Sequence, residues 1–98
     1  GEALFITSPV VLETIWVLSS AYRFTRMEIV NAFENLMMLP AVIIEQRELL
    51  ISLCRTAGNS DIDLSDLYIG LTAQNFDCAT TLTFDRKAAS SPLFTLLK

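Results

Sequence analysis

The chain contains no histidine among its 98 residues. Ser–His and Cys–His nucleophile pairs are therefore excluded, as are the common zinc sites that use imidazole ligands. Cysteine is also scarce: Cys54 and Cys78 lie far apart in apolar surroundings, without CxxC spacing. Isolated thiols of this kind are typical of reduced core residues in a cytoplasmic protein, and a disulfide between them is the less favoured alternative.

Charge is sparse and mainly negative. Charged residues make up 18% of the chain, and the formal net charge at pH 7 is −4. The general attraction for phosphate that drives most nucleic-acid binding is therefore absent, so a nucleic-acid function would need metal ions or a local basic patch. Hydrophobic residues reach 52%, which indicates either a sheet covered on both faces or a surface that binds a partner.

No segment has the pattern of a membrane span or a signal peptide. The most apolar run, LMMLPAVII, is too short to cross a bilayer and is interrupted by Pro40. The N-terminal GEALFITS carries no basic region ahead of an apolar core. We therefore expect a cytoplasmic protein that does not associate with membranes.

Short apolar segments alternate with helical patterns. The strand FIT is followed by Ser8 and Pro9, which predict a helix entry with the Ser8 hydroxyl as cap. That helix continues to about Tyr22 and is apolar on nearly all sides, so we expect it to be largely buried. Thr25 and Glu28 have the spacing of a capping box, and the amphipathic helix that they open leads to the strand AVII.

The second half of the chain repeats this alternation. The expected elements are a helix from Leu49 to Gly58, a helix that starts after Asp61 and ends near Phe76, the strand ATTLTF, and a short edge strand near Phe94. Strands that alternate with helices predict an α/β domain with a mostly parallel sheet and helices on both faces. We expect one such domain, a three-layer α/β/α arrangement, over residues 1–98.

Three acidic residues lie in apolar surroundings. Glu13 is the only charged residue between Glu2 and Arg23, and a buried carboxylate is costly unless it is neutralised, paired or bound to a metal ion. Asp66 falls in the first turn of its helix, where the helix dipole favours an anion, and Asp85 ends the strand TLTF. Because sites in such folds form beyond the carboxyl ends of the strands, we expect the three acids to face one cleft.

Three carboxylates in one cleft repel one another and require a cation or protonation. Without histidine, oxygen ligands favour Mg²⁺ or Mn²⁺, and the chemistry that such a site supports is phosphodiester hydrolysis. Each acid also has a simpler interpretation. Asp66 is a common helix-start residue, Asp85 followed by Arg86 is common in turns, and Glu13 is within reach of several arginines.

The order and spacing of these motifs resemble the PIN-domain family. SPVVLETIWVL and DLSDLYIGLTAQNFDCATTLTFDRKA look like the second, third and fourth acidic motifs of PIN domains, most closely those of VapC-type toxins. The intervening RFTRMEIVNAFENLMMLPAVIIEQRELL is similar to their two-helix segment, so the likeness covers essentially the whole chain. It implies a Mg²⁺- or Mn²⁺-dependent endoribonuclease, the toxin of a VapBC-type toxin-antitoxin pair. It also implies a homodimer that a VapB-like antitoxin holds inactive.

The resemblance also implies a role for particular residues. Glu13, Asp66 and Asp85 correspond to the catalytic, metal-binding acids, while Asp63 and Thr83 match supporting positions. The candidate phosphate contacts for RNA are Arg23, Arg26, Arg86 and Lys87. The apolar helical segments 16–22 and 33–37 are candidates for contact with a second toxin chain or the antitoxin.

One part of the family pattern is missing. PIN domains begin with a strand that carries an aspartate, whereas nothing ahead of Glu13 matches it and EALF resembles the end of the first helix. The resemblance therefore implies an N-terminally truncated PIN-like domain with exposed strand edges, which would dimerise or take the missing segment in trans. A catalytically silent PIN-fold protein that pairs with an antitoxin or another toxin chain is the main alternative. A different α/β domain, such as a phosphoryl-transfer receiver, is a third.

Overall fold

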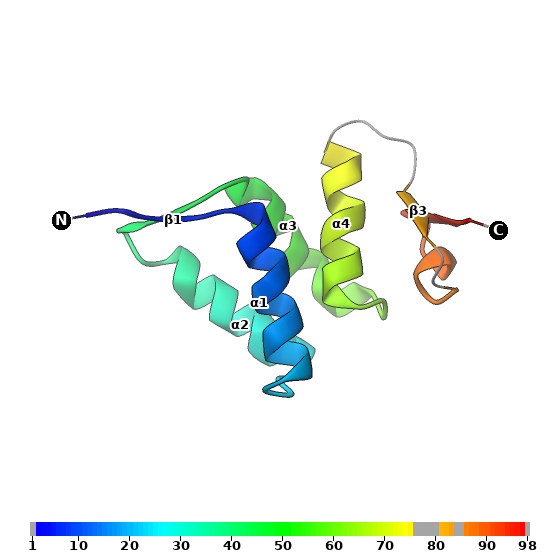
Figure 1. Ribbon diagram of the computed structural model, residues 1–98, viewed down its shortest axis with the longest axis horizontal. Coiled ribbons are helices and arrows are strands. Elements are labelled where there is room, and N and C mark those ends of the chain that lie inside the picture. The colour runs from blue at the N-terminus through cyan, green and yellow to red at the C-terminus, as the bar shows by residue number, and fades with distance from the viewer. Residues whose placement is uncertain (1, 76–80, 84–85, 98) are drawn as a thin grey trace.

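Helices and strands alternate in the order that the sequence predicts. In a computed structural model, residues 2–75, 81–83 and 86–97 are described, with only the backbone of 81–83 (Figure 1). The helices are α1 (Ser8–Ser20), α2 (Arg26–Met37), α3 (Arg47–Thr56) and α4 (Leu64–Asn75), with 3-10 turns η1 (Ala57–Asn59) and η2 (Ala88–Ser90). The strands are β1 (Leu4–Ile6), β2 (Val42–Ile44), β3 (Thr81–Thr83) and β4 (Phe94–Leu96). The protein is therefore a mixed α/β chain in which helix predominates.

The strands form two separate parallel pairs. β1 pairs with β2, and β3 pairs with β4, each over three residues. Figure 1 shows the β1 strand and the β3 strand toward opposite ends of the molecule, with α1 and α4 between them. The parallel pairing agrees with the α/β expectation. A single sheet does not form among the described strands, because none of them lies between β1 and β3.

The sheet of β1 and β2 has one covered and one open face. Ile44 is buried and Ile6 packs against the core, on the side that meets the helices. Phe5 and Ile43, which are partners in the strand register, point to the other face and are 60% and 52% exposed. Within the described part of the chain, helices therefore cover only one side of this sheet.

The core is built mainly from the inward stripes of the helices. Its largest fully buried side chains are Tyr68, Ile15, Ile29, Leu50, Leu53, Ile62 and Val11. Such burial stabilises by about 1.5–3 kcal/mol for each large aliphatic side chain, before the entropy cost of ordering it. None of the described helices has both the length and the apolar character needed to pass through a bilayer.

The expectation that the first helix is largely buried is wrong. Only Val11 and Ile15 of α1 are buried, while Val10 and Val17 are exposed and Trp16 is 65% exposed. α1 contacts α2 and α4 along one stripe, and the described chain covers nothing on its outer side. A helix that is apolar on all sides therefore leaves a band of large apolar residues at the surface.

Two capping interactions fix the helix entries. The predicted capping box is confirmed: the Glu28 N–H donates to Thr25 Oγ1 at 3.2 Å, and the Thr25 N–H donates to Glu28 Oε1 at 2.8 Å. These hydrogen bonds hold the pKa of Glu28 below its usual value. The predicted Ser8 hydroxyl cap is wrong, because α1 begins at Ser8 itself and its N–H donates to Glu45 Oε1 at 2.9 Å. A carboxylate at the end of β2 thus caps the helix that follows β1.

We predict that alanine has opposite effects at two glycines. A Cβ at Gly70 of α4 would lie 3.0 Å from Phe94 Cε2 and 3.1 Å from Leu93 Cβ, so overpacking against β4 outweighs the gain in helix propensity. We expect Gly70→Ala to lower the free energy of unfolding by about 1–3 kcal/mol in chemical denaturation. The matched variant Gly58→Ala meets no atom within 4 Å and should raise it by about 0.4–1 kcal/mol. Equal effects at both positions would show that α4 does not pack against β4 in this way.

Candidate functional site

The helices α1 and α4 carry two of the candidate acids, Glu13 and Asp66, and Asp63 directly precedes α4. The two helices lie side by side and run in opposite directions (Figure 1). Two hollows lie along the seam between them. The Asp63 cavity, of about 460 Å³, lies where α1 ends and α4 begins. The Tyr68 pocket, of about 370 Å³, lies where α1 begins and is lined by Ser8, Pro9, Leu12, Tyr68, Ile69, Thr72 and Ala73.

Glu13 lies on the exposed flank of α1, not in the core. The expectation that a buried Glu13 needs a compensating group is therefore wrong, because water can solvate its carboxylate. Glu13 lines a small surface hollow with Val10, Thr14, Val17 and Leu18, and none of these residues lines either hollow of the seam.

Asp66 lies in the first turn of α4, as the sequence predicts, and is half-buried. One helical turn further along, Ile69 lines the exposed side of the Tyr68 pocket, and Ala73 follows one turn later. Asp66 itself lines neither hollow of the seam. Glu13 and Asp66 therefore lie on neighbouring helices, but the hollows of the seam do not bring their carboxylates together.

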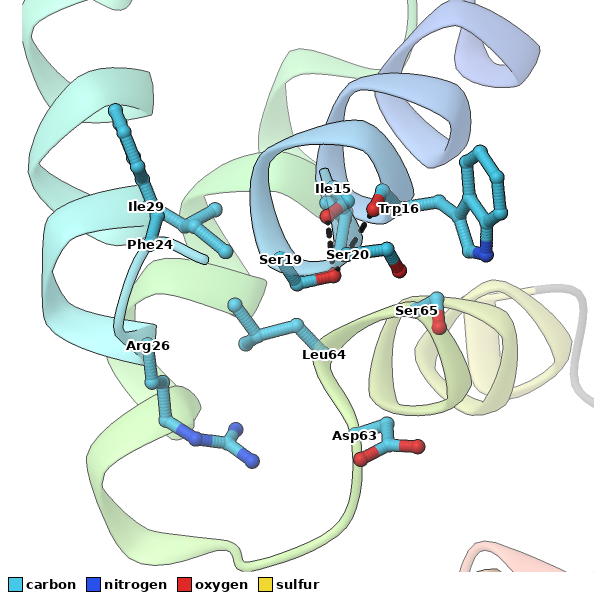
Figure 2. A pocket seen from close by; sticks show the side chains of 10 residues that line it. All are labelled: Ile15, Trp16, Ser19, Ser20, Phe24, Arg26, Ile29, Asp63, Leu64 and Ser65. Carbon is cyan, nitrogen blue, oxygen red and sulfur yellow. Dashed lines mark hydrogen bonds between the residues drawn. The ribbon is translucent and has the colours of Figure 1, made fainter. Parts of the chain in front are cut away.

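Asp63 lies directly before α4 and is exposed. Its backbone C=O accepts the Leu67 N–H at 2.9 Å, which is the first helical hydrogen bond of α4. Figure 2 shows the Asp63 carboxylate at the edge of the Asp63 cavity, below Ser65 and across from Arg26. The structure thus confirms that Asp63 lies one turn before Asp66, but at the hollow where α1 ends.

The structure describes only some of the site residues that were predicted at and after the end of the strand TLTF. Thr83 is the last residue of β3 and pairs with Leu96, and its side chain lies outside the description. Asp85 lies outside the described residues altogether, while Arg86 and Lys87 are exposed just after it. Among the residues that the structure describes, no three Asp, Glu or Cys side chains form a group that could hold a metal ion. The predicted trio therefore stays a prediction that depends on Asp85.

Arg26 has a structural role that the sequence analysis did not foresee. Its guanidinium donates to the Ala57 C=O at 3.4 Å and also to the Ile62 C=O. These bonds join the start of α2 to the segment between α3 and α4. Arg26 therefore stabilises the fold rather than projecting freely toward RNA. The partners lie 31 and 36 residues away in the chain, so no local pattern could have revealed them.

Cys54, which the sequence predicts to be a reduced core thiol, is half-buried and packs against the core. It is a free cysteine on α3, and burial raises its pKa to about 11, with a smaller contribution from the negative charge of Glu34. The thiol is therefore protonated at neutral pH and is a poor nucleophile. Cys78 lies outside the described residues.

Two residues that line the Tyr68 pocket carry buried hydroxyl groups that were not found from the sequence. The Tyr68 phenol and the Ser8 hydroxyl are buried, and neither has a hydrogen-bond partner in the described structure. The sequence pattern predicted Tyr68 as an apolar helix position and Ser8 as a helix cap. Because Glu45 caps α1 in place of Ser8, the Ser8 hydroxyl is left buried without a partner in the described structure.

Comparison with known proteins does not identify a relative. No protein-family model, curated protein or solved structure matches the chain.

We predict that Arg26 matters for stability and that Arg23 does not. Arg26→Gln would leave the carbonyls of Ala57 and Ile62, both on buried residues, without their charged donor. Hydrogen bonds of this kind contribute about 1.5–3 kcal/mol, and we expect a loss of that size in urea denaturation.

The control for this experiment is Arg23→Gln. Arg23 is exposed, and its positive φ of 54° is equally unfavourable for glutamine, so the change should stay within about 0.5 kcal/mol. If both variants lose the same stability, the guanidinium of Arg26 is not the group that holds these segments together.

Proposed function

We propose that this chain is a PIN-like, VapC-type toxin domain whose complete form is a metal-dependent endoribonuclease. The observation that carries the proposal is the antiparallel contact between α1 and α4, the helices on which Glu13 and Asp66 lie. It makes neighbours of two helices whose acidic motifs are far apart in the sequence. The order of helices and strands, and the end of β3 just before Asp85, also agree with this assignment. The three-layer PIN arrangement, with helices on both faces of one sheet, is part of the proposal.

The acids have the donor chemistry that Mg²⁺ or Mn²⁺ prefers. Carboxylate oxygens suit these hard cations, and no imidazole is present to favour zinc. Glu13 and Asp66 fit as ligands in type, and Asp85 would complete the set. When bound, such an ion supplies a water of lowered pKa and positive charge for phosphodiester hydrolysis.

The chain's own residues would orient the RNA around these acids. Glu13 is exposed, so its carboxylate is open to a bound ion and to substrate. Asp66 is held by the first turn of α4, and Asp63 lies one turn earlier. Arg86 and Lys87 are exposed and follow Asp85 directly, a position from which they can contact phosphate. With a net charge of −4, RNA binding depends on such local positive charge.

Binding to an antitoxin or to a second toxin chain is favoured by a separate observation. Large apolar side chains are exposed on and beside α1 and α2, and the set is Val10, Trp16, Val17, Tyr22, Phe24 and Met27. A band of this kind marks an interaction surface more often than an ordinary solvated one. It supports the proposed homodimer and VapB-like antitoxin. It equally supports the second candidate function, a catalytically silent protein that pairs with an antitoxin or toxin chain.

We predict that removal of either acid abolishes most RNA cleavage. Glu13→Gln and Asp66→Asn each remove one negative ligand from the proposed site, and we expect cleavage of single-stranded RNA with Mn²⁺ to fall about 100-fold or more. Chelation of the metal ion should have the same effect. Glu13→Gln should leave the thermal midpoint unchanged, because the side chain is exposed.

The matched control is Glu48→Gln, which removes an exposed acid from α3, away from the seam between α1 and α4. The assay compares the 98-residue chain with a form extended by an aspartate-bearing strand. Cleavage by the extended form that survives both substitutions would refute the ribonuclease assignment. Antitoxin binding without any cleavage by either form would favour the silent binding protein.

A further inference from the structure

The Asp63 cavity, where α1 ends and α4 begins, combines charged, hydroxyl and aromatic groups. Its volume of about 460 Å³ falls within the range of about 300–1,000 Å³ that is usual for small-ligand sites. Its lining includes an acid, a cation, two aromatic residues and a serine, namely Asp63, Arg26, Trp16, Phe24 and Ser65 (Figure 2). Unlike the apolar Tyr68 pocket, this cavity can offer a ligand both hydrogen bonds and aromatic surface.

The carboxylate of Asp63 and the guanidinium of Arg26 both keep unused hydrogen-bonding capacity. The Asp63 side chain is exposed, and no hydrogen bond or ion pair engages its carboxylate in the described structure. Arg26 is half-buried, and its bonds to the Ala57 and Ile62 carbonyls fix the guanidinium at the cavity. A guanidinium has more N–H donors than these bonds use. Since the two charged groups lie across from each other (Figure 2), the cavity presents acceptors on one side and donors on the other.

This pairing of opposite charges disfavours the simplest occupants. The Asp63 carboxylate repels an anion such as phosphate, and the Arg26 guanidinium repels an organic cation. A hydrocarbon would displace water from both charged groups without replacing its hydrogen bonds. The cavity instead suits a neutral, planar ligand that offers N–H donors to the carboxylate and acceptors to the guanidinium, with a flat face for the aromatic side chains.

We propose that the Asp63 cavity binds a guanine base. Guanine presents adjacent N–H donors, at N1 and at the N2 amino group, that suit the Asp63 carboxylate, and its O6 and N7 acceptors suit the Arg26 guanidinium. Adenine and cytosine carry a ring acceptor where guanine has its N1–H donor, and uracil flanks its ring N–H with carbonyl oxygens on both sides. Trp16 and Phe24, which are 65% and 37% exposed, supply aromatic surface for stacking.

The inference deepens the proposed function, because single-stranded RNA displays unpaired bases that proteins read by stacking and by hydrogen bonds. It rests on that function only for the source of the guanine, since a free nucleoside or nucleotide carries the same base. Binding of either source can be measured without metal ions and without cleavage. Failure of the ribonuclease assignment and failure of the guanine site are therefore separate results.

The first test uses Trp16, the only tryptophan of the chain, as a reporter. With EDTA present, we expect guanosine to quench the tryptophan fluorescence in a saturable manner and to raise the thermal midpoint. Inosine lacks the N2 amino group and should bind about tenfold more weakly, because one hydrogen bond to the carboxylate is lost. Adenosine should bind no better than inosine. Equal binding of the three nucleosides, or neither effect with millimolar guanosine, would overturn the proposal.

The source of the base is tested with a short oligoadenylate RNA that contains one guanine. Binding of this RNA more tightly than guanosine would assign the site to RNA, whereas binding no tighter than guanosine would assign it to a free nucleoside or nucleotide. The all-adenine RNA of the same length should bind at least about tenfold more weakly than the guanine-containing one. Equal binding of the two RNAs would contradict a guanine site.

The second test changes the carboxylate. Asparagine is as well suited as aspartate to the position before a helix, so Asp63→Asn should fold, but it replaces a charged acceptor oxygen by a donor. We expect this variant to bind guanosine about tenfold more weakly and to bind adenosine as before. The matched control, Asp61→Asn, removes the same charge from an exposed residue that lines a different hollow, and should leave guanosine binding unchanged. Unchanged guanosine binding by Asp63→Asn, or an equal loss in both variants, would count decisively against the guanine site.

Discussion

The packing of α1 against α4 is the contact on which the candidate site depends. Glu13 and Asp66 belong to motifs far apart in the chain, and this antiparallel contact makes their helices neighbours. The contact is apolar in its depth, where Ile15 and Tyr68 are each 2% exposed. Burial of this inner stripe therefore supplies the free energy that holds the two helices together, and the exposed Glu13 contributes little to it.

Two polar side chains, Glu45 and Arg26, anchor the segments on either side of this contact. The Glu45 carboxylate accepts the Ser8 N–H at the start of α1, while its own N–H donates to Ile6 in β1. One residue thus joins the end of β2 to both the strand and the helix that surround the Tyr68 pocket. Arg26 does the equivalent at the other end of the seam, where it ties α2 to the segment that leads into α4. The two hollows of the seam lie between these two polar anchors.

Local patterns in the sequence predicted most of the secondary structure. The capping box of Thr25 and Glu28 and the first-turn position of Asp66 were correct, because each depends on neighbours within one helical turn. What failed depends on distant partners. Ser8 was expected to cap α1, but Glu45 does so from another strand. Arg26 was expected to be free for RNA, but carbonyls more than thirty residues away engage it.

The burial of α1 was the largest error, and it changes the argument about Glu13. Apolar residues around the helix suggested burial on all sides, but composition alone does not say how many neighbours a helix has. In the described structure α1 is covered on one stripe, so Glu13 is solvated and needs no partner for stability. Because the Glu13 carboxylate contributes neither stability nor a burial cost to the described fold, it is available for a chemical role.

Partial coverage also leaves apolar side chains exposed on the sheet of β1 and β2. Phe5 and Ile43 lie exposed side by side on one sheet, the outer edge of β1 has no partner among the described strands, and the Ser8 and Tyr68 hydroxyls are buried without partners in the described structure. Exposed apolar area, an unpaired edge and unsatisfied hydroxyls are three different costs, and water can relieve only the exposed edge well. The apolar area and the two hydroxyls therefore stay uncompensated in the described structure.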